Sequence, residues 1–205
     1  MAIIVVGGQS RSVGKTSVVA GLLEALPAHR WTAFKITQFG HGRCSLNGKV
    51  CQCATADHRW AISEENEPSG RSDTSRFLRA GAKRVFWVRT QQGRLADAVP
   101  AIRRHLAEAE NALLESNSIV QFIRPDLYLT VLDPEVEDFK ISAQALLDRA
   151  DALILHRRKG ARGNGGFHRL RLDRPMFSIE PPPYLTKEII DFVASHLKKP
   201  SPLAP

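Results

Sequence analysis

A glycine-rich run near the N-terminus has residue types that can bind phosphate. Residues 7–16 read Gly-Gly-Gln-Ser-Arg-Ser-Val-Gly-Lys-Thr, close to the phosphate-loop pattern G-x-x-x-x-G-K-[S/T] but with one more residue between the glycines. Glycines let backbone N–H groups turn toward phosphate oxygens. Lys15 can reach the β- and γ-phosphates, and the Thr16 hydroxyl can bind Mg²⁺. The run therefore predicts an ATP or GTP site formed by Gly8, Gln9, Ser10, Arg11, Ser12, Val13, Gly14, Lys15, Thr16 and Ser17.

Three polar residues elsewhere in the chain are candidates for the same site. Lys35 and Glu115 each end an apolar run that is typical of a strand, and ligands bind at the carboxyl ends of parallel strands. Lys35 is thus expected at the phosphates, and Glu115 on Mg²⁺, directly or through water. Asp73 is either a third Mg²⁺ ligand or a helix cap. The predicted catalytic residues are Lys15, Lys35 and Glu115, and the predicted Mg²⁺ ligands are Thr16, Glu115 and Asp73.

All three cysteines lie in a long segment of little periodicity, about residues 37–70. Three thiolates and one imidazole make a tetrahedral zinc site, so Cys44, Cys51 and Cys53 are candidate ligands. His41 is the first choice for the fourth ligand, and His58 is the alternative. Reactive thiols and three unrelated free thiols are the other interpretations.

The candidate site residues are far apart in the sequence, so strands and helices must bring them together. Short apolar runs alternate with amphipathic stretches, which predicts βαβ units and a mainly parallel sheet. The expected strands are 2–6, 31–36, 84–89, 112–115, 126–132, 152–155 and an edge strand at 175–179. The expected helices are 15–26, 73–80, one that starts near Asp97 or kinks at Pro100, 139–150 and 186–197.

Composition and charge exclude several protein classes. Of the 205 residues, 43% are hydrophobic and 24% are charged, which is close to the globular average and excludes disordered and coiled-coil chains. No apolar run is long enough to span a membrane, and the first residues do not resemble a secretion signal, so a cytoplasmic protein is expected. The net charge of +8 suits an anionic partner. The segment 157–174 contains seven basic residues and one acidic residue. This segment is either a solvated loop or a binding surface.

The glycine-rich run, with five residues between Gly8 and Gly14-Lys15-Thr16, is similar to that of dethiobiotin synthetase and its relatives in the P-loop class. Within this class, the run together with Phe34-Lys35-Ile36, Ser69–Thr74 and Arg79–Ala82 resembles the molybdopterin-guanine dinucleotide biosynthesis protein B (MobB) family. The match covers about the first 90 residues. The chain departs from the family at Glu115-Ser116-Asn117-Ser118, where the family has Glu-Gly, and at the cysteine-containing segment.

This resemblance implies an α/β three-layer αβα sandwich of the P-loop NTPase type, here a single domain over 1–205 with an insertion at about 37–70. It also implies a Mg²⁺-dependent NTPase with an accessory role in cofactor biosynthesis, acting with a small-molecule or protein partner. The second interpretation is a dethiobiotin-synthetase-like ligase or small-molecule kinase, in which Asn117 could contact the acceptor. The third is a nucleic-acid-associated ATPase. Nucleic acid is the least favoured partner, no membrane partner is expected, and a homodimer is left open.

Overall fold

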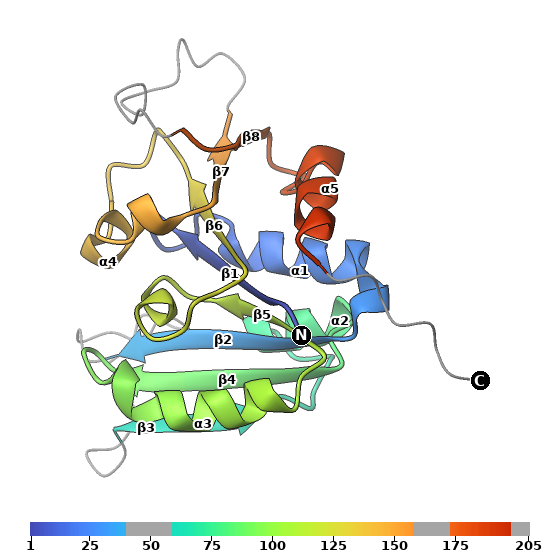
Figure 1. Cartoon of the computed structure of the whole chain (residues 1–205), viewed down its shortest axis with the longest axis vertical. Coiled ribbons are helices and arrows are strands. Elements are labelled where there is room, and N and C mark those ends of the chain that lie inside the picture. Colours follow the sequence, from blue (N-terminus) through green and yellow to red (C-terminus); the bar gives the residue numbers. More distant parts are fainter. Residues whose placement is uncertain (40–58, 158–172, 198–205) are drawn as a thin grey trace.

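Eight strands form a single sheet in the order β3-β4-β2-β5-β1-β6-β7-β8 (Figure 1). The structure is a computed structural model that describes residues 1–39, 59–157 and 173–197. All neighbouring strands in this sheet are parallel except β3 and β4, which are antiparallel. The strands are β1 (Ile3–Gly8), β2 (Trp31–Phe39), β3 (Trp60–Glu64), β4 (Arg84–Gln91), β5 (Asn111–Glu115), β6 (Leu127–Leu132), β7 (Ala152–His156) and β8 (Met176–Ile179).

Helices cover both faces of the sheet. They are α1 (Lys15–Ala25), α2 (Asp73–Arg79), α3 (Leu95–Ala107), α4 (Ile141–Gln144) and α5 (Lys187–Ser195). Buried side chains of α1, α2 and α5 join one apolar cluster, and those of α3 and of the 3₁₀ turn after α4 join another on the opposite face. This arrangement confirms the predicted α/β three-layer sandwich. None of the described helices has the length and apolar character needed to cross a bilayer.

Strand alternation decides which face each residue serves. Side chains of successive strand residues point to opposite faces of a sheet. On β2, Trp31 and Ala33 therefore pack with α1 and α2, whereas Phe34 and Ile36 pack with α3. Lys35 shares the face of Ala33, and this places a charged side chain on the α1 side at the end of the apolar stretch.

Two segments differ from the sequence-based expectation. The segment 37–70 was expected to lack regular structure, yet β2 continues to Phe39 and β3 pairs with β4 at the sheet edge. The main-chain pairing available beside β4 overrides the weak local pattern. The expected helix at 139–150 was wrong in extent, since only α4 and a 3₁₀ turn, Leu147–Arg149, are helical. Arg174 donates to the carbonyl oxygens of Leu147, Asp148 and Ala150, which fixes a turn there.

Helix α3 begins at Leu95 and contains Pro100, so it starts before the expected Asp97. The residues from 40 to 58, with the three cysteines, His41 and His58, lie outside the described part of the chain, as do 158–172 of the basic stretch. The zinc prediction and the basic-surface prediction therefore stay predictions.

The fold predicts a large stability loss for Leu113→Ala. Leu113 is fully buried on β5, between Ile4 of β1 and Ala33 of β2. Truncation of a buried leucine costs about 2–5 kcal/mol through lost transfer energy and a residual cavity. Ile141→Ala is the matched control, because Ile141 is 84% exposed, and it should change stability by less than about 0.5 kcal/mol. Urea unfolding followed by circular dichroism compares them, and equal midpoints would contradict this core assignment.

Candidate functional site

The glycine-rich loop joins β1 directly to α1, as the sequence predicted. Gly14 precedes α1 with φ of 96°, a left-handed conformation. A Cβ atom on Gly14 would lie 2.4 Å from Cε1 of Tyr184. Glycine is therefore required at this position both by the backbone angle and by the close approach of the aromatic ring.

Side chains from other loops hold the glycine-rich loop in place. Asn117, at the end of β5, accepts a hydrogen bond from the Gly8 N–H at 2.7 Å and donates one to the Gly8 carbonyl at 2.9 Å. The buried Gln9 accepts from the Asp133 N–H at 2.9 Å and donates to the carbonyl of Val136. In the structure, Asn117 therefore positions the loop, whereas the sequence suggested that it contacts the second substrate that accepts the phosphoryl group. Nothing in the local sequence pattern marks that role.

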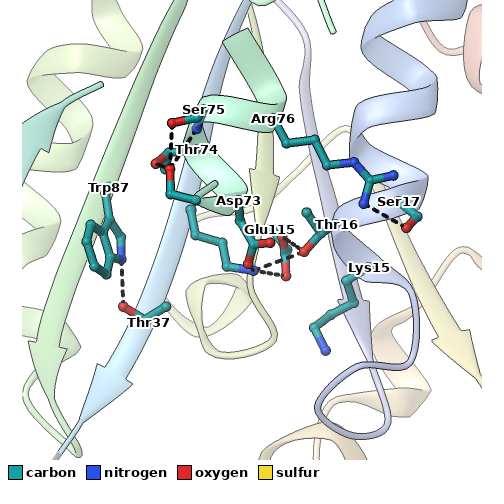
Figure 2. Close-up of polar contacts among 12 residues, drawn as sticks. Lys15, Thr16, Ser17, Thr37, Asp73, Thr74, Ser75, Arg76, Trp87 and Glu115 are labelled. Atoms are coloured by element: carbon teal, nitrogen blue, oxygen red, sulfur yellow. Dashed lines mark hydrogen bonds and ion pairs between the residues drawn. The ribbon is translucent and has the colours of Figure 1, made fainter. Parts of the chain in front are cut away.

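Four of the predicted residues meet around one ammonium group. Lys35 Nζ lies 2.5 Å from Glu115 Oε1, 2.8 Å from Asp73 Oδ2 and 3.2 Å from Thr16 Oγ1, and Thr16 donates to Glu115 Oε2 at 2.9 Å. Figure 2 shows the side chains of Thr16, Asp73 and Glu115, which extend from α1, α2 and β5. Asp73 is not the helix cap, because Ser72 takes that position and its Oγ accepts from the Ser75 N–H.

Burial and charge oppose each other at Lys35. Its side chain is 14% exposed, and that of Glu115 is 3% exposed. Burial alone would lower the pKa of Lys35, but the charges of Glu115 and Asp73 raise it above its ordinary value. Lys35 is therefore held as a cation among oxygen atoms of one hydroxyl and two carboxylates. Oxygen donors of this kind are those that Mg²⁺ prefers, so the set fits the predicted metal.

Two more lysines lie near the loop. Lys15 Nζ donates to the Ser10 carbonyl at 2.5 Å. Burial, together with the charges of Lys140 and Lys35, lowers the pKa of Lys15 to about 8, although Glu115 opposes the shift. Burial and the nearby charge of Arg11 also lower the pKa of Lys140. Sequence reasoning missed Lys140, which precedes α4 and whose backbone N–H donates to the Gln9 carbonyl at 3.0 Å.

A cavity of about 410 Å³ opens beside the loop, at the carboxyl ends of β7 and β8. His156 and Asp133 face each other in it at 3.6 Å between Nδ1 and Oδ2, and the Tyr184 ring stands edge-on to His156. The cavity is lined by Ser12, Asp133, His156, Arg157, Glu180, Pro181 and Tyr184.

No protein-family profile matches the sequence, and no curated protein matches it. Among solved structures, the chain is similar to HypB from Helicobacter pylori, which was solved in complex with nickel. The TM-score is 0.50 and the identity 13%, over 95% of this chain and 86% of HypB. Together with the mainly parallel sheet and the glycine-rich loop between β1 and α1, this likeness decides the fold. The chain has the P-loop NTPase fold.

Two further structures of this class are also similar. LpxK from Aquifex aeolicus, in complex with ATP, gives a TM-score of 0.46 and 20% identity over 87% of this chain. The chain spans only 53% of the length of LpxK. The MinC:MinD cell division complex of Aquifex aeolicus gives a TM-score of 0.42 and 15% identity, over 96% of this chain and 86% of that one.

The described residues test neither the zinc prediction nor the predicted Mg²⁺ ligands. In the described residues, no group of three or more His, Cys, Asp or Glu side chains could hold a metal ion. Thr16, Glu115 and Asp73 nevertheless form a mixed hydroxyl and carboxylate set around Lys35. The arrangement can therefore bind a cation and, through the three lysines and the loop N–H groups, a polyphosphate.

The Lys35 pair predicts a stability loss for Glu115→Gln. This change removes the buried charge that lies closest to Lys35. Loss of one partner of a buried ion pair costs about 3–5 kcal/mol, and we expect about 2 kcal/mol because Asp73 and Thr16 still contact the ammonium. Asp73→Asn is the control and should cost less than about 1 kcal/mol, because Asp73 is 51% exposed and screened by water. Denaturant midpoints measure both variants, and equal losses would contradict this ranking.

Proposed function

We propose that this protein binds a Mg²⁺–nucleoside triphosphate at residues 8–17 and hydrolyses it or transfers its phosphoryl group. The observation that carries the proposal is the glycine-rich loop between β1 and α1, with Lys15 and Thr16 at the start of the helix and Lys35 in contact with Thr16. Burial lowers the pKa of Lys15 and Lys140, and the repulsion of neighbouring cations lowers the pKa of each further. A polyphosphate bound among them would offset that repulsion.

The loop supplies the remaining contacts that a triphosphate needs. Gly14 and the first turn of α1 present backbone N–H groups and the positive end of the helix dipole. Lys15 would leave the Ser10 carbonyl and bind phosphate oxygens, which stabilises the charge that develops during phosphoryl transfer. Thr16 precedes Ser17, whose Oγ accepts a hydrogen bond from Arg76 at 3.1 Å. Arg76 thereby adds a fourth cation at the same helix end.

Mg²⁺ would be held by Thr16, Glu115 and Asp73, and when bound it would neutralise charge on the β- and γ-phosphates. The Lys35 ammonium contacts all three of these side chains. We therefore expect Lys35 to turn from these oxygens to the phosphate group when nucleotide and metal are present. Its high pKa keeps it charged for that contact.

The nucleoside would enter the cavity at the ends of β7 and β8, next to the loop. Tyr184 offers an aromatic face, and aromatic rings stack on bases. Donor groups of His156 and Arg157 and acceptor groups of Asp133 and Glu180 line the same space. ATP and GTP are both candidate ligands.

Two roles are proposed for the bound nucleotide. The MobB-like role in cofactor assembly is supported by the resemblance of Phe34-Lys35-Ile36, Ser69–Thr74 and Arg79–Ala82, and it calls for slow basal turnover that a partner protein raises. The alternative is a small-molecule kinase or ligase, which is favoured by the cationic, aromatic surface on β4 described below. Turnover in the presence of a small anionic acceptor separates the two.

Lys15→Ala should lower the affinity for Mg-ATP and Mg-GTP about 100-fold, because charge-assisted hydrogen bonds to phosphate are lost. Lys83→Ala is the matched control, since Lys83 is a surface lysine with a 53% exposed side chain, and it should bind like the parent. Isothermal titration calorimetry measures the affinities. Equal affinity of the Lys15 variant and the parent, with both proteins folded, would overturn the proposed nucleotide site.

Nucleotide affinity should also fall as the pH rises through about 8. The free protein holds Lys15 with a pKa of about 8, and a bound phosphate would raise that pKa. Below pH 8 the ammonium is already charged, so binding takes up no proton at Lys15. Well above pH 8 a proton must be taken up, and affinity drops by up to about tenfold per pH unit. Calorimetry in two buffers of different ionisation enthalpy detects this uptake, and a flat affinity between about pH 7 and 9 would contradict it.

A further inference from the structure

On the face of the sheet that packs against α1, one part carries core residues and another part carries polar side chains. Beyond the N-terminus of α2, strands β2, β4 and β3 direct side chains to the side of the sheet that packs against α1. We call the surface that these side chains form the β4 platform. In register across the three strands, it consists of Lys35 and Thr37, Trp87 and Arg89, and Ser63 and Ala61. The alternate residues of the same strands, Phe34, Ile36, Phe86 and Val88, are buried beneath α3. The polar character is thus specific to the face that holds the P-loop.

Arg89 is the second cation of this platform, beside Lys35, and no acidic side chain among the described residues pairs with it. Its guanidinium carbon lies 4.6 Å from the centre of the Trp87 ring, and one terminal nitrogen donates to Ser63 Oγ at a long 3.3 Å. In the part of the chain that the structure describes, the contacts of its guanidinium are those with Trp87 and Ser63, and its buried Nε has no hydrogen-bond acceptor. A buried donor without an acceptor is costly, so an anion at this point would satisfy it.

Arg84 on the same strand shows what a structural arginine looks like in this protein. Its guanidinium also lies over a ring, 4.8 Å from the centre of Phe86. It is fully engaged, however, by Glu64 at 2.8 Å and Glu108 at 2.9 Å. The contrast indicates that Arg89 is not simply another stacked arginine of the sheet edge.

Trp87 is held in a fixed orientation beneath Arg89. The indole N–H donates to Thr37 Oγ1 at 2.9 Å, across to β2 (Figure 2). Stacking on the ring orients the guanidinium plane while leaving its edge able to donate to an anion. The pair therefore forms a preorganised, flat cationic surface.

This surface lies beside the phosphate end of the candidate nucleotide site. Trp87 is paired with Lys35 across the strands, and Arg89 lies two residues further along β4, a step of about 6.6 Å. Lys35 in turn contacts Thr16 at the start of α1. A molecule on the platform would thus approach the metal and terminal phosphate from the β4 side.

We propose that Trp87 and Arg89 bind the anionic group of a second substrate, a small molecule that carries a carboxylate or a phosphate. The guanidinium binds either group through two parallel N–H···O hydrogen bonds. The placement of this subsite next to the γ-phosphate rests on the proposed nucleotide function. The anion-binding property of Arg89 itself does not.

Nuclear magnetic resonance of the ¹⁵N-labelled protein tests the proposal directly. The protein is saturated with Mg²⁺ and a non-hydrolysable nucleotide and then titrated with inorganic phosphate, and separately with acetate, at constant ionic strength. We expect saturable shifts of the Arg89 Nε–H and Trp87 Nε1–H resonances. Phosphate alone would identify a phosphorylated substrate, and acetate alone a carboxylic acid. The indole N–H of Trp31, which donates to the Leu26 carbonyl inside the core, serves as the internal reference.

Variants separate an anion site from a structural contact. Arg89→Gln should raise the half-saturating anion concentration about tenfold or more, with Trp87 Nε1–H as the reporter, because a charge-assisted contact is lost. Arg89→Lys keeps the charge but loses the fork, and should fall between Arg89→Gln and the parent. Arg84→Gln is the matched control, and its Arg89 response should equal that of the parent.

Two outcomes would overturn the subsite: neither resonance moves at tens of millimolar phosphate or acetate, or Arg89→Gln titrates like the parent. The same titration of the nucleotide-free parent protein distinguishes this failure from that of the proposed function. If the parent does not bind nucleotide but its Arg89 still responds to the anion, the nucleotide proposal fails and the anion site stands. If nucleotide binds and Arg89 is silent, only the subsite fails.

Discussion

One buried ammonium group joins most of the elements of this site. Lys35 projects from β2 and contacts Glu115 at the end of β5, Asp73 at the start of α2 and Thr16 at the start of α1. The Lys35 side chain is only 14% exposed. The fold can hold a charged group with so little hydration only when nearby polar or charged groups compensate for the lost water contacts. The contact therefore fixes how the two helices sit at the carboxyl edge of the sheet. It also keeps a set of oxygen donors together.

The loop that faces this cluster is positioned by the hydrogen bonds of two side-chain amides. Asn117 makes two hydrogen bonds to the backbone of Gly8, and Gln9 ties the loop to residues 133–136. A loop held in this way loses little further conformational entropy when a ligand binds. The same packing brings Lys140 and Lys15 close enough to lower the pKa of Lys15. The hydrogen bonds that hold the loop therefore also keep Lys15 and Lys140 close together, although their charges repel.

Strand alternation divides the chemistry of the protein between two faces. On β4, residues 86 and 88 are core, and residues 87 and 89 belong to the face of the candidate site. The two arginines of this strand follow the same division. Arg84 is neutralised by two carboxylates at the sheet edge, whereas Arg89 rests on an indole with its buried Nε unpaired among the described residues. One strand therefore provides both a structural ion pair and a candidate binding group.

The amino-acid sequence by itself determined the local features of this protein. The glycine-rich loop between an apolar run and a helix was sufficient to predict the P-loop fold. The ends of the apolar runs at Lys35 and Glu115 were sufficient to nominate those two side chains, although β2 itself continues past Lys35 to Phe39. These predictions depend on short-range spacing and on the rule that parallel strands present their carboxyl ends together.

Only the tertiary structure decided the long-range features. It showed that Asn117 holds the loop, brought Lys140 close to Lys15, added β3 to the sheet edge, and placed Trp87 beside Lys35 and Arg89 beside Thr37. None of these follows from local pattern, because each depends on pairing and packing between segments tens of residues apart. Contact between such segments is set by the strand order and register of the whole sheet, which no single stretch of sequence encodes.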